Sequence, residues 1–281
     1  MTDTGIVVLA QNNSRDNYVI QACLLAMSVK LTNPNLPISI ITNDSIDDEY
    51  IQFFDKIIPI PFGDSAKNTE WKVENRWKIY HASPYERTIV MDTDMLILQD
   101  ISSWIDFLSN YKMYFTSNVY TYRGELVTSD FYRKTFIANK LPNLYVGFHY
   151  FEKGEFAHEY YKWMELVTNN WELFYGQYAK EFYPGRCSMD VTASIVSKIL
   201  DCDEDITNKI AKFPSFTHMK PKIQNWIKSQ SSWQDTVGTY ISDDCSIKLG
   251  NYKQIGILHY TENDFIDKQG ILDVYRRYLN V

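Results

Sequence analysis

The chain has 281 residues, of which 45% are hydrophobic and 22% charged, a composition typical of a globular protein with a large core. The formal net charge is −7, and no run of lysine and arginine stands out in the sequence. Nucleic-acid and anionic-membrane partners are therefore disfavoured, and an anionic substrate would need a local cation. The apolar run at residues 6–10 is too short for a signal peptide or a membrane span. We expect a cytoplasmic protein without membrane insertion; nothing in the sequence indicates its oligomeric state.

The four cysteines are widely spaced and form no Cys-x-x-Cys pair: Cys23, Cys187, Cys202 and Cys245. A zinc knuckle or a disulfide framework needs closer and more regular spacing. We therefore predict reduced cysteines with a structural role.

The first hundred residues alternate short apolar runs with helical patterns. Apolar side chains recur at helical spacing from about residue 17 to 31, and Ser14 or Asp16 is a candidate for the N-terminal cap. We expect a second helix at 74–81 and strands at 5–10, 38–42, 56–60 and 88–91. A strand–helix–strand rhythm of this kind predicts a mainly parallel sheet with helices on both faces.

After about residue 110 this rhythm loosens. We expect strands at 113–117, 145–151 and 255–260, and helices at 155–169, 189–200 and 265–279. No internal repeat, low-complexity tract or Pro/Gly-rich linker divides the chain. We therefore expect a single domain over residues 1–281.

The pattern Asp-x-Asp occurs three times in the sequence. Two of the matches share Asp203 in a polar, acidic stretch at 201–205, which we interpret as a solvated surface turn. Asp92 and Asp94 differ because apolar runs flank them on both sides, where unpaired carboxylates are costly. They follow a predicted buried strand, at the carboxyl edge where open α/β sheets bind ligands.

Two neighbouring carboxylates repel each other, and a divalent cation relieves that repulsion. Hard oxygen ligands suit Mn²⁺ or Mg²⁺. We therefore predict a metal site at Asp92 and Asp94; the alternative is a capped strand end with surface carboxylates.

Two stretches of the sequence resemble a known family. R-W-K-I-Y-H-A-S-P-Y-E-R-T-I-V-M-D-T-D-M-L-I-L-Q-D-I, at 76–101, resembles the metal-site region of GT-A glycosyltransferases, especially the retaining galactosyltransferase and glycogenin group, glycosyltransferase family 8. V-V-L-A-Q-N-N-S-R-D-N-Y, at 7–18, resembles that family's opening strand and nucleotide loop. The resemblance covers roughly residues 5–100. It implies an α/β fold of the GT-A type: a Rossmann-like, mixed but mostly parallel sheet flanked by helices. A nucleotide-binding half would span about 1–110 and a more irregular acceptor-binding half about 111–281.

The resemblance also implies roles for individual residues. Asp94 would bind the metal directly, and Asp92 would contact the ribose or the metal, with Thr93 between them. Arg76, and after it Lys78, matches a basic residue near the diphosphate. The residues implied at the nucleotide base and ribose are Ala10, Gln11, Asn12 and Tyr18, and Asp16 and Asn17 belong to the same D-N-Y signature. For Tyr18, packing at the start of a helix is an equal alternative.

The family places a third metal ligand, a histidine, near the C-terminus. His259, at the end of an apolar strand, is the preferred match, and His218, in F-T-H-M-K-P-K, is the alternative. Each could instead be a hydrogen-bonded structural histidine. Lys220 could approach the diphosphate, although a surface lysine is the simpler interpretation.

Two later segments carry weaker resemblances. L-Y-V-G-F-H-Y-F resembles the family's strand with a small-residue turn beside the donor sugar, which selects Gly147, although Tyr145 stands where the family has asparagine. R-C-S-M-D-V-T-A-S-I resembles the segment with an acidic residue near the reacting sugar carbon, which selects Asp190, with Met189 in place of a polar neighbour. The alternative for Asp190 is an acid in the first turn of a helix, which the helix dipole favours.

Together these features predict a metal-dependent glycosyltransferase. It would move a sugar from a nucleotide-diphosphate sugar, with a UDP-sugar favoured, to the hydroxyl of an unidentified acceptor, with retention of configuration. The cation and Arg76 would stabilise the leaving diphosphate, and Asp190 the reacting sugar carbon. One alternative is a non-catalytic nucleotide- or glycan-binding module on the same fold.

A second alternative is a haloacid-dehalogenase-like phosphatase, which also places Asp-x-Asp after an apolar strand. That site normally follows the first strand of the domain, whereas three predicted strands precede Asp92. Met95 and Leu96 also stand where small residues would be expected. The sequence therefore favours the transferase.

Overall fold

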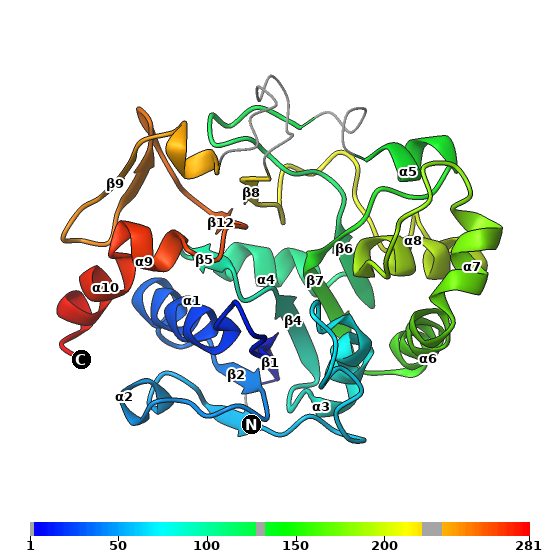
Figure 1. The fold of residues 1–281 in the computed structure, drawn as a ribbon, viewed down its shortest axis with the longest axis horizontal. Helices are drawn as coiled ribbons and strands as arrows, with labels where there is room; N and C mark the ends of the chain where they lie inside the picture. The colour runs from blue at the N-terminus through cyan, green and yellow to red at the C-terminus, as the bar shows by residue number, and fades with distance from the viewer. Residues whose placement is uncertain (1–2, 128–132, 221–231) are drawn as a thin grey trace.

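The computed structural model describes residues 3–127, 133–220 and 232–281. Its centre is a six-stranded sheet with the strand order β3-β2-β1-β4-β7-β6 (Figure 1). Four neighbouring strands are parallel: β1 (Thr4–Leu9), β2 (Ile38–Ile41), β3 (Lys56–Ile58) and β4 (Arg87–Met91). Strand β7 (Tyr145–Glu152) runs antiparallel to both β4 and β6 (Met113–Thr116). The predicted α/β fold with a mixed, mostly parallel sheet is confirmed.

Helices cover both faces of this sheet, which is why its strands are apolar on both sides. Ile6 and Val8 of β1 face one core, and Val7 and Leu9 face the other. The first core includes α1 (Tyr18–Thr32), α4 (Ser102–Leu108) and α10 (Ile271–Leu279). The second includes α6 (Glu155–Asn169), α7 (Trp171–Tyr178) and α8 (Met189–Leu200).

The helix predictions hold with local corrections. The predictions at 155–169 and 189–200 match α6 and α8. The side chain that caps α1 is Asn17, whose Oδ1 accepts the Ile20 N–H at 3.0 Å, so the expected caps Ser14 and Asp16 were wrong. The helix expected at 74–81 is a 3-10 helix, η1 (Val73–Lys78), continued by α3 (Ile79–Ala82).

The helix expected at 265–279 is interrupted. Gly270, with φ +58°, separates α9 (Phe265–Gln269) from α10, and glycine adopts this left-handed conformation at little cost. The remaining helices are short: α2 (Asp48–Ile51), α5 (Lys134–Ala138) and the 3-10 turn η2 (Trp233–Asp235). Such short elements carry no helical period, so the sequence did not reveal them.

Two small sheets complete the fold. The first has the order β5-β12-β8 and consists of Met95–Ile97, Ile257–His259 and Thr217–His218. The second is antiparallel and contains β9 (Thr239–Ile241), β10 (Ile247–Leu249) and β11 (Tyr252–Lys253). Only β12 was expected, because it lies within the longer apolar run at 255–260; the other strands have two or three residues and no such run was recognised around them.

Three other expectations concern the surface and the thiols. All four cysteines are buried and free, as predicted. The acidic stretch at 201–205 forms a turn after α8 and is mostly exposed, as predicted. Within the described ranges, no helix combines the length and the apolar character needed to cross a bilayer.

Candidate active site

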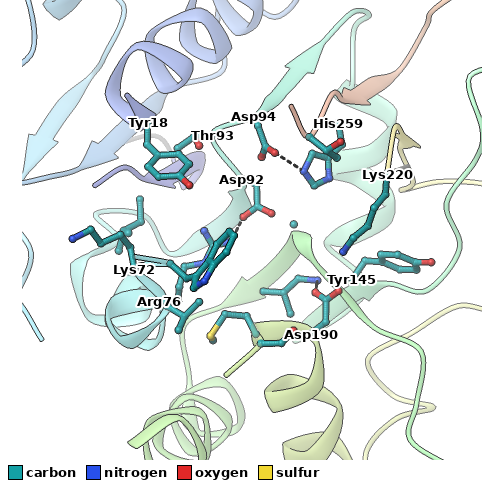
Figure 2. A pocket seen from close by; sticks show the side chains of 18 of the residues that line it. Tyr18, Lys72, Arg76, Asp92, Thr93, Asp94, Tyr145, Asp190, Lys220 and His259 are labelled. Carbon is teal, nitrogen blue, oxygen red and sulfur yellow. Dashed lines mark hydrogen bonds and ion pairs between the residues drawn. The ribbon is translucent and has the colours of Figure 1, made fainter. Parts of the chain in front are cut away.

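A cleft of about 330 Å³ opens where β4 ends, at the carboxyl edge of the parallel strands (Figure 2). This is the edge at which open α/β sheets bind ligands. Its lining draws on seven helices and strands and on the segment after β4, and it includes most of the residues selected from the sequence: Gln11, Tyr18, Arg76, Asp92, Thr93, Asp94, Gly147, Asp190 and His259. Segments that are far apart in the sequence therefore meet in one site.

Two carboxylates and an imidazole form a cluster suited to a metal ion. One ligand atom from each of Asp92, Asp94 and His259 lies within 4.8 Å of the others. Their side chains are 22%, 18% and 11% exposed, so the cluster is open only toward the cleft. Two hard oxygen donors and one nitrogen fit Mn²⁺ or Mg²⁺.

The small sheet explains why His259 reaches this cluster. Strand β12 pairs with β5 so that His259 lies opposite Met95, directly after Asp94. His259 Nε2 is 3.0 Å from Asp94 Oδ2 (Figure 2). His218, opposite His259 on β8, stacks its ring on that of His259 with centroids 4.7 Å apart. The structure thus brings His259, rather than His218, beside the two carboxylates.

The pKa of Asp94 reflects opposing effects. Burial raises this pKa, but the charge and hydrogen bond of His259, together with the charge of Arg76, outweigh burial and lower it. The carboxyl group is therefore held in its anionic form, which is the form that binds a cation.

Asp92 is fixed by two different partners. Arg76 donates from Nη2 to Asp92 Oδ1, and the Asp92 N–H donates to the Gly147 carbonyl at 2.9 Å. A Cβ at position 147 would lie 2.9 Å from Asp92 Oδ2 and 3.0 Å from the Met95 methyl group. Gly147 was expected in a turn beside the donor sugar; it lies within β7 instead, and its missing side chain makes room for the Asp92 carboxylate.

Asp190 lies in the first turn of α8, as its alternative interpretation expected, and it also lines the cleft. Its Oδ1 accepts the Val146 N–H at 2.9 Å, and its Oδ2 accepts Arg133 Nη1 at 2.5 Å. Burial raises the pKa of Asp190, but Arg133, the Val146 N–H and Lys220 outweigh burial and lower it. Asp190 is therefore an anion on the side of the cleft opposite Tyr18 (Figure 2).

Arg133 was missed in the sequence, yet it is one of the most constrained side chains near the cleft. It is 4% exposed, and its guanidinium lies over the rings of Phe136 and Tyr145, at 3.8 and 4.1 Å from their centroids. Tyr145 stands where the family has asparagine, and here it contributes one of these rings. A lone arginine with no local motif gives no sequence signal for such an environment.

On the other side of Asp92, the cleft is lined by Tyr18, Thr93 and Asn263. Thr93 Oγ1 donates to Gln21 Oε1 at 2.9 Å, and Gln21 Nε2 donates to Asn263 Oδ1 at 3.0 Å. Gln11 also lines the cleft, but both polar atoms of its side-chain amide are hydrogen-bonded within the protein. Its Nε2 donates to Asp64 and its Oε1 accepts from Asn75.

Four residues expected at the nucleotide lie outside the cleft lining: Ala10, Asn12, Asp16 and Lys78. Asn12 supports the loop, since its N–H donates to Asp44 Oδ2 at 2.7 Å and its Oδ1 accepts the Val19 N–H at 3.0 Å. Asp16 accepts a hydrogen bond from Asn13.

Lys78 is 1% exposed and points into the protein rather than toward the cleft. Its Nζ donates to the Gly63 carbonyl at 2.5 Å, to Asn75 Oδ1 at 2.6 Å and to Ser65 Oγ at 3.0 Å. These bonds tie the loop at 63–75 to η1. Of the two basic residues selected from the sequence, Arg76 is therefore the one that lines the cleft.

The sequence interpretation missed other cleft residues: Trp71, Lys72 and Arg186. Arg186 lies four residues before Asp190, in the segment that already resembled the family, so its charge was a usable signal. Lys220 has solvent access, as a surface lysine would, but Figure 2 shows its side chain pointing into the cleft.

The fold and the cleft define an α/β protein with a cleft at the carboxyl edge of its sheet. The cleft contains a candidate metal-binding cluster of Asp92, Asp94 and His259. No family model matches the chain, and no curated protein matches it.

Solved structures do match the chain, and the similar ones include glycosyltransferases. GlyE from Streptococcus pneumoniae TIGR4 is 15% identical over 74% of this chain and 46% of its own, with a TM-score of 0.39. The galactosyltransferase LgtC, solved with donor and acceptor sugar analogs, is 15% identical over 69% and 70%, with a TM-score of 0.43. Mouse xyloside xylosyltransferase 1 is 10% identical over 74% and 84%, with a TM-score of 0.46. This chain thus spans less than half of GlyE, and these similarities concern the fold.

Proposed function

We propose that this protein is a metal-dependent glycosyltransferase that moves a sugar from a UDP-sugar to an acceptor hydroxyl with retention of configuration. The observation that carries the proposal is the cluster of Asp92, Asp94 and His259 within 4.8 Å, in a cleft that also holds Arg76 and Asp190. The choice of uridine and of retention rests on the sequence resemblance to glycosyltransferase family 8.

In this proposal Asp94, His259 and the Asp92 oxygen not bonded to Arg76 hold the cation. Mn²⁺ or Mg²⁺ supplies positive charge that stabilises the departing diphosphate. Arg76 donates to Asp92 and adds a guanidinium to the same region. Lys220, two residues after the end of β8, points into the cleft. Preorganised positive charge of this kind favours the transition state, where negative charge develops on the leaving group.

The remaining cleft divides into two ends around Asp92. Tyr18, Thr93 and Asn263 form the end for the nucleoside, next to α1 and the C-terminal segment. Asp190 marks the end for the sugar (Figure 2). Its anionic carboxylate, held by Arg133 and the Val146 N–H, would stabilise the positive charge that develops on the reacting sugar carbon.

The two halves of the chain would contribute different residues to the site. Residues 1–110 would supply both metal-binding carboxylates and, with Tyr18 and Thr93, most of the nucleoside end. Residues 111–281 would supply Asn263 of that end, His259, Asp190 and the acceptor side, and they also add β6 and β7 to the central sheet.

A non-catalytic module on the same fold is the second candidate. The observation that favours it is the ion pair of Asp92 with Arg76, which already neutralises one carboxylate without a cation. The phosphatase alternative is disfavoured because Asp92 follows β4, and because Met95 and Leu96 are fully buried in β5 instead of leaving open space beside Asp94.

The test is the release of UDP from a panel of UDP-sugars, measured with Mn²⁺ and again with EDTA. We expect release with at least one donor, abolished by EDTA and restored by added Mn²⁺. Binding of UDP without release from any donor would favour the non-catalytic module. Release that persists in EDTA would contradict the metal dependence, and hydrolysis of a simple phosphate ester would revive the phosphatase.

A further inference from the structure

Trp71 and Arg186 meet at the rim of the cleft, although 115 positions separate them in the chain. Both line the cleft, and the Arg186 Cζ lies 3.6 Å from the centroid of the Trp71 ring. At that separation the planar guanidinium lies against the indole face, and its N–H groups point outward from the edge of the stack. The contact therefore fixes a cation at the rim without using its hydrogen-bond donors.

Arg186 has no anionic partner in the part of the chain that the structure describes: its one contact there is with Trp71. Both side chains are exposed, Trp71 to 53%. The neighbouring Lys72 differs, because its Nζ donates to the Ala66 and Lys67 carbonyls at 2.8 and 3.0 Å and so serves the loop. Arg186 is thus the rim cation whose donors face solvent and ligand.

The position of Arg186 assigns it to one end of the cleft. It lies four residues before Asp190, which marks the end opposite Tyr18 (Figure 2). It is also near enough to Lys220 for its charge to act on that ammonium group.

Charges elsewhere in the cleft are already matched under the proposed function. Asp190 is paired with Arg133, and Asp92 with Arg76. A divalent cation at Asp94 and His259, with Lys220, would balance the diphosphate of the donor. Arg186 remains, on the side where an acceptor must approach the reacting carbon. A neutral acceptor would leave its charge unused.

We propose that the acceptor carries an anionic group, a carboxylate or a phosphate, and that Arg186, held against Trp71, binds it. This inference rests on the proposed function, because it is that function which distinguishes the acceptor end from the nucleoside end. A guanidinium binds either anion through two parallel hydrogen bonds, so the two sources share one chemistry.

The test compares the binding of three methyl glycosides to the full chain in the presence of Mn²⁺ and UDP, by titration calorimetry. Methyl glucoside is neutral, methyl glucuronide carries a carboxylate, and methyl glucoside 6-phosphate carries a phosphate. We expect the wild-type protein to prefer one of the charged ligands over the neutral one by about tenfold, which corresponds to about 1.4 kcal/mol. Whichever charged ligand is preferred identifies the anion.

Arg186→Gln should reduce this preference to about one. Arg123→Gln is the matched control, because Arg123 is also exposed and also lies over an aromatic ring, that of Tyr122 at 5.3 Å, but is not among the cleft residues. It should keep the preference of the wild type.

Two results would overturn the inference. The first is a wild-type protein that binds the charged and neutral glycosides equally, or binds none of them at millimolar concentration. The second is an Arg186→Gln protein that loses affinity for UDP while its glycoside preference stays unchanged, which would place Arg186 at the donor. Because this binding assay needs no turnover, a charged-glycoside preference without UDP release would retain the anion site and reject only the proposed function.

Discussion

The two ends of the cleft balance their carboxylates in different ways. Asp190 has a partner inside the protein, since the buried Arg133 donates to it at 2.5 Å and the Val146 N–H at 2.9 Å. Asp94 meets His259 at 3.0 Å, and the other ring nitrogen of His259, Nδ1, is buried without a hydrogen bond to any described residue. The Asp190 end is therefore complete as folded, whereas under the proposed function a cation would complete the metal end, the cluster of Asp92, Asp94 and His259.

Changes at the metal end should act on turnover and leave the fold intact, because the protein does not rely on Asp94 for a closed network. Changes at the Asp190 end should affect stability and turnover together, because there the charges compensate each other within the fold.

Asp94→Asn tests the metal end and has the largest expected effect on activity. The amide keeps the size of the side chain but loses the charge that holds a cation. We expect Mn²⁺-dependent UDP release to fall by about 10³-fold, the upper range for loss of one electrostatic contact in an active site. The melting temperature should change little, and both quantities are measured on the same preparation.

The matched control is Asp203→Asn, which alters an Asp-x-Asp pattern in the turn after α8. It should leave turnover and melting unchanged. Turnover that survives Asp94→Asn would exclude Asp94 as a metal ligand and would leave Asp92 and Asp94 no different from the two Asp-x-Asp patterns at 201–205.

Arg133→Met tests the other end. It removes the guanidinium and leaves the Asp190 carboxylate without its strongest partner, so we expect a loss of about 3 kcal/mol of unfolding free energy. Turnover should fall by about 10²-fold. In the folded protein burial raises the pKa of Asp190, but Arg133 and the other partners outweigh burial and lower it. The pKa should therefore rise when Arg133 is replaced. The acidic limb of the pH–rate profile should then move to higher pH.

Two comparisons separate these effects. Arg133→Lys keeps the positive charge, and should restore the acidic limb at least in part. Arg276→Met breaks an ion pair of 2.8 Å with Glu49, away from the cleft, and should alter stability slightly and the pH–rate profile not at all. An unchanged acidic limb in Arg133→Met would show that Arg133 only supports the fold.

The same contrast explains how much of the site the sequence could reveal. The metal end depends on local sequence: Asp92 and Asp94 lie between apolar runs, and β12 ends at His259. The central strands were found from signals that are also local, because each contains a short apolar run, and α6 and α8 were found because their apolar residues recur at helical spacing. Even there, β5 was missed, although its pairing with β12 is what places His259 next to Asp94.

The sugar end depends on contacts between distant segments. Arg133 and Asp190 are 57 positions apart, and the Trp71–Arg186 contact joins two loops. No local pattern distinguishes these residues from solvated charges. Lys78 shows the opposite error, a residue that local sequence selected wrongly for the cleft. It lies two positions after Arg76, but its side chain turns inward because three oxygen acceptors from the 63–75 segment surround its Nζ.

Gly147→Ala tests the packing of β7 against Asp92, which lies between the two ends of the cleft. The added methyl group would meet Asp92 Oδ2 at 2.9 Å, and either the carboxylate or β7 must shift. We expect a loss of about 1–2 kcal/mol of stability from overpacking, and a fall in turnover of about tenfold as Asp92 moves.

Gly176→Ala is the control for this glycine. It lies in α7, and a Cβ there would meet nothing within 4 Å. Alanine at that position should stabilise the protein by about 0.5–1 kcal/mol, because glycine is the poorer helix former. Full turnover in Gly147→Ala would mean that the exact position of Asp92 is unimportant, contrary to its place in the cluster.

His149→Gln gives the smallest expected effect and tests the support behind the Asp190 end. His149 Nδ1 contacts the Val146 carbonyl at 2.8 Å and its Nε2 contacts the Tyr161 hydroxyl at 2.8 Å, so the neutral ring holds the residue whose N–H binds Asp190. Burial lowers the pKa of His149 to about 3.

The direction of the resulting pH dependence follows from this depressed pKa. Below an unfolded-state pKa of about 6.5 the unfolded chain takes up a proton that the folded chain refuses, so stability falls by up to about 1.4 kcal/mol per pH unit as the pH drops from 6.5 toward 3. His149→Gln removes this proton uptake. For the variant, the free energy of unfolding measured with urea between pH 7 and pH 5 should then show a shallower pH slope than for the wild type, whatever the change in stability at pH 7.

Asp190 cannot mimic the effect, because its lowered pKa makes its contribution fade only below about pH 4. Equal slopes in variant and wild type would mean that His149 has the same pKa in the folded and the unfolded chain, so that the ring behind Asp190 would become a cation as the pH falls below that value.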